Sequence, residues 1–344
     1  MKSIKTTDAV GCVLAHDITQ IIPGKFKGPV FKKGHIVQEE DIPVLLSVGK
    51  ENLYVYEKKE GELHEDEAAF ILKDIAIGEN SELKFSGPSE GKIEIKTPID
   101  GLFKVRSEAL IKVNSVPEIM IASRHSNTPV FAGDKLAGMR VIPLVIASSR
   151  LDEAKAAAGD EPLFSVLPFK KMKYALITTG SEVYKGLIKD AFGPVIDKKM
   201  SEYNCTRIEQ KILPDGKEGI KAAIKEEAEK GAELILVSGG MSVDPDDTTP
   251  SAISESVDKV SFYGAPVLPG AMFMLGYLTH EGKTIPVMGL PGCVMYAGRT
   301  IFDLVLLRIL AGEILEREDI VKYGEGGLCL NCEVCHYPNC GFGK

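Results

Sequence analysis

Between residues 173 and 312 the sequence alternates short apolar runs with longer helical segments. The runs 173–180, 233–240 and 284–292 are apolar and end in glycine. The segment 217–232 has its apolar residues on one helical face, and 294–312 is apolar almost throughout. Strands that are apolar on both sides belong to parallel sheets covered by helices. We therefore expect an α/β fold here, with a parallel sheet and helices on both faces.

The rest of the chain differs in pattern from this region. An amphipathic helix within 34–49 and an alternating strand at 52–58 indicate a mixed α/β segment at the N-terminus. Short segments between turns then predict a small β-rich module, which includes a strand at "ALIKVN" (109–114). The expected parts are an α/β segment (1–74), a β-rich module (75–148), a linker (149–172), the α/β domain (173–315) and a Cys-rich tail (316–344).

Charge and hydropathy exclude several classes of function. The 344 residues have a formal net charge of −8 and no basic stripe, which argues against binding to nucleic acid. No apolar run reaches the ~18 residues of a membrane helix, and the N-terminus lacks the apolar core of a secretion signal. We expect a cytoplasmic protein that does not enter the membrane.

Glycines and polar residues follow three of the expected strands, at 178–182, 238–250 and 289–293. Ligands of open parallel sheets bind beyond the carboxyl ends of the strands. Glycine allows close backbone approach, and helix starts favour anions such as phosphate. Taken singly, a glycine pair is a turn and an acidic loop is a solvated loop. Together, the three strand ends predict one anion-binding cleft with carboxylates at its rim.

The segments "LITTGSEV", "ELILVSGGMSVDPDDTTP", "APVLPGAMFMLGYL" and "PVMGLPGCVMYAGRTIFDLVLLRILAG" occur in this order. They resemble the molybdopterin-binding fold of molybdopterin molybdotransferases and molybdopterin adenylyltransferases over about 140 residues, from 173 to 312. Residues 9–18 and 31–57 look like the parts of the multidomain molybdotransferase that precede its binding domain. The resemblance therefore favours the molybdotransferase.

This resemblance implies roles for individual residues. It implies catalytic roles for Glu182, Asp244 and Asp247, and it makes Asp246 and Asp247 ligands of Mg²⁺. A bound cation would offset the repulsion among these carboxylates. The implied contacts to molybdopterin are Thr179, Gly180, Ser181, Ser238, Gly239, Gly240, Met241, Ser242, Thr248, Pro269, Gly270, Leu290, Pro291 and Gly292.

The function implied is molybdenum cofactor biosynthesis: binding of molybdopterin or its adenylate and Mg²⁺-dependent insertion of molybdate. The family is typically homodimeric, so a homodimer is implied as well. Two alternatives stay open. One is a non-catalytic carrier that delivers the cofactor to a client molybdoenzyme. The other is a nucleotide pyrophosphatase of the competence-damage type, which shares the fold and a similar acidic loop.

The sequence also departs from the family pattern. Ser181 replaces the usual Asp, and Cys293 stands where the family has Asn, as either a small hydrophobe or a soft ligand. The Asn-containing motif that follows the first strand end is absent, which leaves Asp190 or Asp197 as candidate substitutes. An N-terminal signature and a C-terminal β domain are also absent. These departures favour the carrier.

Four of the seven cysteines lie in the last sixteen residues. Cys329, Cys332, Cys335 and Cys340 have the spacing C-x2-C-x2-C-x4-C, with His336 between the last two. The first three match an iron–sulfur run, whereas the fourth is one residue too far along. Zinc binds four cysteines equally well. We expect a [4Fe–4S] cluster or zinc, against the alternative of a disordered tail with free thiols.

Overall fold

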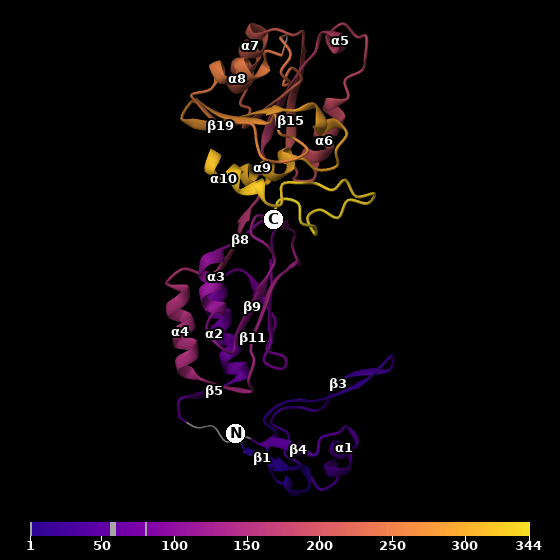
Figure 1. Ribbon diagram of the computed structural model, residues 1–344, viewed down its shortest axis with the longest axis vertical. Coiled ribbons are helices and arrows are strands. Elements are labelled where there is room, and N and C mark those ends of the chain that lie inside the picture. Colours follow the sequence, from indigo (N-terminus) through magenta and orange to yellow (C-terminus); the bar gives the residue numbers. More distant parts are fainter. Residues whose placement is uncertain (1, 56–59, 80, 246) are drawn as a thin grey trace. The chain divides into compact units, whose positions relative to one another are not determined.

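The computed structural model describes residues 2–55, 60–79, 81–245 and 247–344, and it divides into two compact units. Unit 1 comprises 1–98, 105–124 and 131–165, and unit 2 comprises 99–104, 125–130 and 166–344. In the described ranges, no helix is long and apolar enough to cross a membrane. Figure 1 shows the course of the chain.

Unit 1 begins with a small core of Ala9, Leu14, Ile18, Val37, Leu45 and Leu53. Its second part is a four-stranded antiparallel sheet in the order β6-β7-β11-β9, against which α2 packs. The elements of unit 1 are β1 (Lys2–Lys5), η1 (Thr6–Asp8), β2 (Ile18–Ile22), β3 (Phe26–Phe31), α1 (Asp41–Ser47), β4 (Asn52–Val55), β5 (Glu62–His64), α2 (Glu65–Ile77), β6 (Lys84–Phe85), β7 (Ile93–Lys96), α3 (Ser107–Asn114), β9 (Ile119–Ser123), β11 (Lys135–Val141), β12 (Val145–Ala147) and α4 (Ser148–Ala158).

One strand expected in unit 1 is wrong. Residues 109–114 are the last six of the eight residues of α3 rather than a strand. The buried residues of α3 are Ala109 and Val113, whose spacing of four places them on one face of a helix. In this short segment the apolar residues fit both periods, and burial against the fold selects the helix.

Unit 2 is built on a six-stranded sheet in the order β15-β14-β16-β19-β18-β17. Its elements are β14 (Lys173–Thr179), α5 (Ser181–Tyr184), α6 (Phe192–Ser201), β15 (Thr206–Leu213), α7 (Lys217–Glu229), β16 (Leu234–Ser238), α8 (Thr249–Ser256), β17 (Lys259–Tyr263), β18 (Met274–His280), β19 (Lys283–Leu290), η2 (Gly292–Met295), α9 (Ile301–Leu310), α10 (Arg317–Val321) and η3 (Lys322–Gly324). A three-stranded sheet in the order β10-β8-β13, mostly in unit 2, comprises β8 (Gly101–Val105), β10 (Thr128–Val130) and β13 (Phe164–Pro168).

The α/β fold with helices on both faces is confirmed, with one difference in the sheet. The first four strands in the order are parallel, whereas β18 and β17 extend the sheet antiparallel. β18 turns directly into β19 through Glu281 and Gly282, both at positive φ. A two-residue turn of this kind joins antiparallel strands, and its "EG" pair is the sequence signal for the hairpin.

The two faces of the sheet pack against two separate hydrophobic cores. On β14, Ala175 and Ile177 face the cluster that contains α7 and α8, whereas Tyr174 and Leu176 face the cluster that contains α6 and α9. All four side chains are buried, which accounts for the unbroken apolar run. Figure 1 shows α7 and α8 on one side of the sheet and α6 and α9 on the other.

Candidate functional site at the strand ends

Strand register brings the three predicted strand ends to one edge of the sheet. Thr178 of β14 pairs with Ser238 of β16, and Ser238 pairs with Leu290 of β19. The segment before β18 reaches the same edge, since Met274 pairs with Gly289. The glycine-rich segments 178–182, 238–242, 269–270 and 290–292 therefore lie along one edge.

The Gly239–Gly240 pair has a backbone that only glycine adopts easily. Gly239 has φ of 90° and Gly240 has φ of 58°. A methyl group on Gly239 would collide with the carbonyl oxygen of Thr179, and one on Gly240 would lie 2.8 Å from Thr249 Oγ1. Thr249 fixes the loop, because its hydroxyl donates to the Gly239 carbonyl (2.8 Å) and its N–H donates to the Gly240 carbonyl (3.2 Å).

The hydroxyl of Thr179 has no hydrogen-bond partner among the described residues. Its side chain is 5% exposed, and its Oγ1 is buried without a hydrogen bond to any residue that the structure describes. The oxygen faces the glycine pair, since a methyl group on Gly239 would lie 2.7 Å from it. Burying an unsatisfied hydroxyl costs about 1–3 kcal/mol. A ligand at this edge would remove that cost.

The acidic loop joins this edge to α8. Asp244 is exposed and Asp247 is half-buried, and the Asp247 N–H donates to the Asp244 carbonyl at 2.9 Å. Burial, followed by the charge of Asp247, raises the pKa of Tyr263 on β17. Ser242 is exposed and Thr248 immediately precedes α8. Asp246, which the sequence also predicts as a metal ligand, lies outside the described residues.

Glu182 lies on the short helix α5 and is exposed. Its carboxylate lies close to Gly180, since a methyl group there would be 3.5 Å from Glu182 Oε2. The N–H of Ser181 donates to Asp215 Oδ2 at 2.9 Å. Asp215 was not predicted from the sequence, although the Asp-Gly pair one residue beyond β15 is a turn signal at the same edge. Asp215 thus places a further carboxylate beside the first strand end.

The two candidate substitutes for the missing family motif lie at opposite ends of β14. Asp190 accepts from Gln210 Nε2 at 2.6 Å, and Gln210 Nε2 also donates to Thr178 Oγ1 at 3.2 Å. Asp197 instead accepts from the hydroxyl of Tyr174 at 2.5 Å, near the start of the strand. Only Asp190 therefore lies toward the predicted site.

The third strand end is largely buried. Leu290 and Pro291 are buried, Gly292 is exposed and Cys293 is half-buried. Burial raises the pKa of the Cys293 thiol, an effect that a backbone N–H and Lys199 partly oppose. A thiol that stays protonated behaves as a small hydrophobe in the absence of a metal.

Two further predicted contacts pack against neighbouring elements. Met241 is 4% exposed, and its side chain lies over Gly289, where a methyl group would be 2.7 Å from its sulfur. Gly270, at φ of 123°, abuts Ile301, so that any side chain there would collide with the start of α9. The Ile301 N–H also donates to the Pro269 carbonyl at 3.3 Å. Met241 thus packs against β19, and Gly270 packs against the start of α9.

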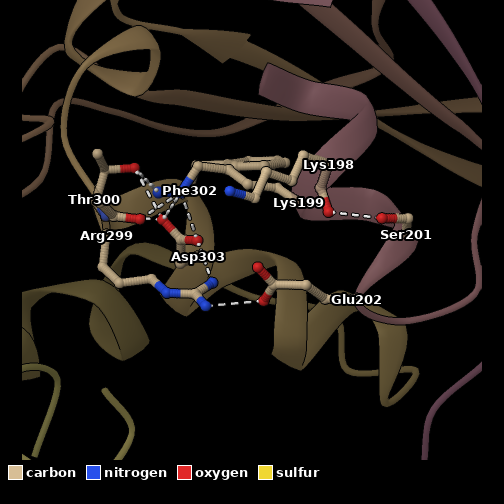
Figure 2. Close-up of polar contacts among 9 residues, drawn as sticks. Lys198, Lys199, Ser201, Glu202, Arg299, Thr300, Phe302 and Asp303 are labelled. Atoms are coloured by element: carbon tan, nitrogen blue, oxygen red, sulfur yellow. Dashed lines mark hydrogen bonds and ion pairs between the residues drawn. The ribbon is translucent and has the colours of Figure 1, made fainter. Parts of the chain in front are cut away.

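A buried ion-pair network supports the segment that follows β19. Lys199 of α6 donates to both oxygens of Asp303 (2.8 and 2.9 Å) and to the Gly298 carbonyl (2.8 Å). Arg299 joins Asp303 to Glu202, at 2.9 and 2.8 Å. Figure 2 shows Asp303 between Lys199, Arg299 and Thr300. Lys199 and Asp303 are 6% and 4% exposed, so this pairing is shielded from water.

No metal centre is preformed in the described part of the chain. Within it, no three His, Cys, Asp or Glu side chains lie close enough together to hold one metal ion. Cys329, Cys332, Cys335 and Cys340 are free, and all four line one cavity together with Tyr296.

The chain is similar to known families in two segments. Residues 175–312 match the family described as "Probable molybdopterin binding domain". Residues 3–57 match a "Domain of unknown function" (DUF8806). The first match coincides with the sheet and the strand-end edge described above, and the second lies in unit 1.

The curated relatives carry related names. The molybdopterin molybdenumtransferase of Haemophilus influenzae is 28% identical over 144 residues, which are 40% of this chain and 34% of that protein. The molybdopterin adenylyltransferase of Pyrococcus furiosus is 26% identical over 136 residues, 36% of this chain and 80% of that protein. A CinA-like protein of Fervidobacterium nodosum is 34% identical over 89 residues, 26% of this chain and 22% of that protein.

Among solved structures, the tungsten cofactor synthesizing protein MoaB of Pyrococcus furiosus matches at 22% identity with a TM-score of 0.34, over 41% of this chain and 92% of that one. This chain thus spans about a third of the molybdenumtransferase and most of the adenylyltransferase. Residues 175–312 are therefore a molybdenum cofactor biosynthesis-type domain, with homologues named for molybdopterin.

Proposed function

We propose that this protein binds molybdopterin or its adenylate at the strand-end edge and promotes the Mg²⁺-dependent insertion of molybdate. The observation that carries the proposal is the unpartnered hydroxyl of Thr179 beside the Gly239–Gly240 pair. Molybdopterin has a phosphate, which needs hydrogen-bond donors. Thr179 Oγ1 and the N–H groups of the half-buried Gly239–Gly240 pair are donors of that kind.

The carboxylates suit the metal-dependent step. Mg²⁺ is usually bound by one or two carboxylates together with substrate phosphates, so it needs no complete protein cage. The Asp247 carboxylate lies beside the glycine pair, since a methyl group on Gly240 would be 3.6 Å from its Oδ1, and Asp244 belongs to the same loop. Asp190, held by Gln210, is the candidate for the carboxylate that the missing family motif would provide. Glu182 is the candidate to handle molybdate.

The decisive assay supplies molybdopterin-adenylate, molybdate and Mg²⁺ under anaerobic conditions and measures AMP release together with cofactor formation. We expect turnover by the full chain. The variant Asp247→Asn should lower it by about 10- to 100-fold, the range typical of changes around a metal site. Glu229→Gln, which neutralises an exposed carboxylate on α7, should leave turnover unchanged. Equal activity of both variants would reject the role of Asp247.

The same assay separates the alternatives. Tight binding of molybdopterin-adenylate without AMP release would make the protein a carrier that serves a molybdoenzyme. Hydrolysis of ADP-ribose in place of molybdopterin-adenylate would make it a nucleotide pyrophosphatase, an activity considered because of the similarity to CinA-like proteins. Size-exclusion chromatography with light scattering tests the proposed homodimer.

A second test concerns the Thr179 hydroxyl. If this hydroxyl serves the ligand, Thr179→Val should weaken molybdopterin binding about tenfold, which corresponds to one hydrogen bond to a charged group. The same change should leave stability equal or higher, because it removes a buried hydroxyl without a partner. Thr179→Ser should restore affinity. Unchanged affinity in Thr179→Val, measured by anaerobic titration calorimetry, would show that the hydroxyl has no part in binding.

A further inference from the structure

The Cys-rich tail is folded onto unit 2 by its backbone. The Leu268 N–H donates to the Gly327 carbonyl and the Cys329 N–H donates to the Leu268 carbonyl, both at 2.8 Å. Leu268 and Leu328 form a parallel bridge, so the tail continues beside the segment that precedes Pro269. The Gly343 N–H then donates to the Gly326 carbonyl at 2.9 Å and closes the tail into a loop.

Side chains hold the far part of the tail against α9. Arg299 lies over the ring of Tyr337, with its guanidinium carbon 5.1 Å from the ring centre. Tyr337 meets Phe342 edge to face at 6.3 Å, and Phe342 is 4% exposed in the core that contains α9. A tail fixed at both ends in this way holds its cysteines in one place.

The four cysteines surround one space. Cys329, Cys332, Cys335 and Cys340 all line a cavity of about 520 Å³, whose wall also includes His336 and Arg299. Cys329 and Cys340 are half-buried, whereas Cys332 and Cys335 are exposed. Cys12, Cys205 and Cys293 do not line it. The segregation of these four thiols in one cavity points to a ligand that binds sulfur.

The size of the cavity helps to distinguish a single zinc ion from an iron–sulfur cluster as the bound ligand. A single Zn²⁺ gathers its thiolates at ~2.3 Å from one point. No three His, Cys, Asp or Glu side chains in the described ranges lie close enough together to hold one metal ion, so the thiols are not arranged around a single Zn²⁺. The cavity also far exceeds the ~30 Å³ that one water occupies in the liquid. An iron–sulfur cluster bridges cysteines that are too far apart for one ion, and the first three cysteines have the spacing of such a run.

We propose that Cys329, Cys332, Cys335 and Cys340 bind a [4Fe–4S] cluster in this cavity. The cluster would lie against residues 296–299, the segment that follows η2 and leads into α9. A cluster held by four thiolates is an anion, and Arg299 in the cavity wall is a cation. The cavity shares Pro269 with the strand-end edge proposed to bind molybdopterin, but the four cysteines are not part of that edge, and the test of the cluster does not depend on that function.

The test is anaerobic reconstitution of the full chain with ferrous iron and sulfide. We expect about four iron and about four sulfide per chain, with the absorption of a [4Fe–4S] cluster. Cys332→Ser/Cys335→Ser should lose the cluster, whereas Cys205→Ser, outside the cavity, should retain it. Circular dichroism checks that each variant is folded, and Cys340→Ser provides a second loss variant if the double variant is unfolded.

His336 lines the same cavity and provides the matched control for the fourth ligand. His336→Ala should keep the cluster and Cys340→Ser should lose it. The reverse result would overturn the assignment of Cys340. One zinc per chain without sulfide, or a folded chain that takes up no iron, would overturn the cluster itself, as would its retention by a folded Cys332→Ser/Cys335→Ser variant.

Discussion

Gly239→Ala should both destabilise unit 2 and abolish molybdopterin binding. The added methyl group would collide with the carbonyl oxygen of Thr179, and backbone atoms cannot rotate away as a side chain can. The φ of 90° adds the strain of a left-handed conformation. Together we expect a loss of about 2–5 kcal/mol in the free energy of unfolding. Urea denaturation followed by circular dichroism measures this loss, and titration calorimetry measures binding.

Gly231→Ala is the matched control for this prediction. Gly231 follows α7 with φ of 86°, but nothing lies within 4 Å of the position of its added methyl group. It should therefore cost only the left-handed strain, about 1–2 kcal/mol, and leave binding unchanged. If Gly239→Ala were no more destabilising than Gly231→Ala and still bound molybdopterin, the close contact with Thr179 would have no role in the site.

The fold of unit 2 could be predicted because its strands are buried on both faces. Ala175 and Ile177 face one core, whereas Tyr174 and Leu176 face the other. The apolar run is therefore unbroken, which is typical of a parallel strand. The antiparallel pairing of β18 with β19 was not predicted, because its signal is a single two-residue turn, Glu281 and Gly282, that lies among charged residues.

The candidate site could be predicted only as far as local sequence specifies it. Glycines after apolar runs indicate strand ends, and the register Thr178–Ser238–Leu290 brings them together. The partners of these residues come from distant parts of the chain. The hydrogen bonds from Gln210 to Asp190 and Thr178 join two strands and a helix start, and no local sequence pattern predicts them.

Disrupting the buried ion-pair network around Asp303 should cause the second large loss of stability. Asp303→Ala should lower the free energy of unfolding by about 3–5 kcal/mol, because it leaves the buried charge of Lys199 without its partner and removes one of the two carboxylates of Arg299. Lys199→Met should cost less, since Asp303 would keep Arg299 and the N–H of Thr300, which donates to it at 2.7 Å. Urea denaturation measures both losses.

Lys225→Ala is the control, because it removes one partner of an oppositely charged pair at the protein surface. Lys225 is 80% exposed and lies 3.9 Å from Glu229, a geometry that contributes under about 1 kcal/mol. A similar loss in Lys225→Ala and Asp303→Ala would mean that burial adds nothing to the network. The network also links α6, which carries Lys199, to Arg299, whose guanidinium lies over the ring of Tyr337. Asp303→Ala should therefore loosen the cysteine tail as well, and faster amide hydrogen exchange at residues 326–343 would report it.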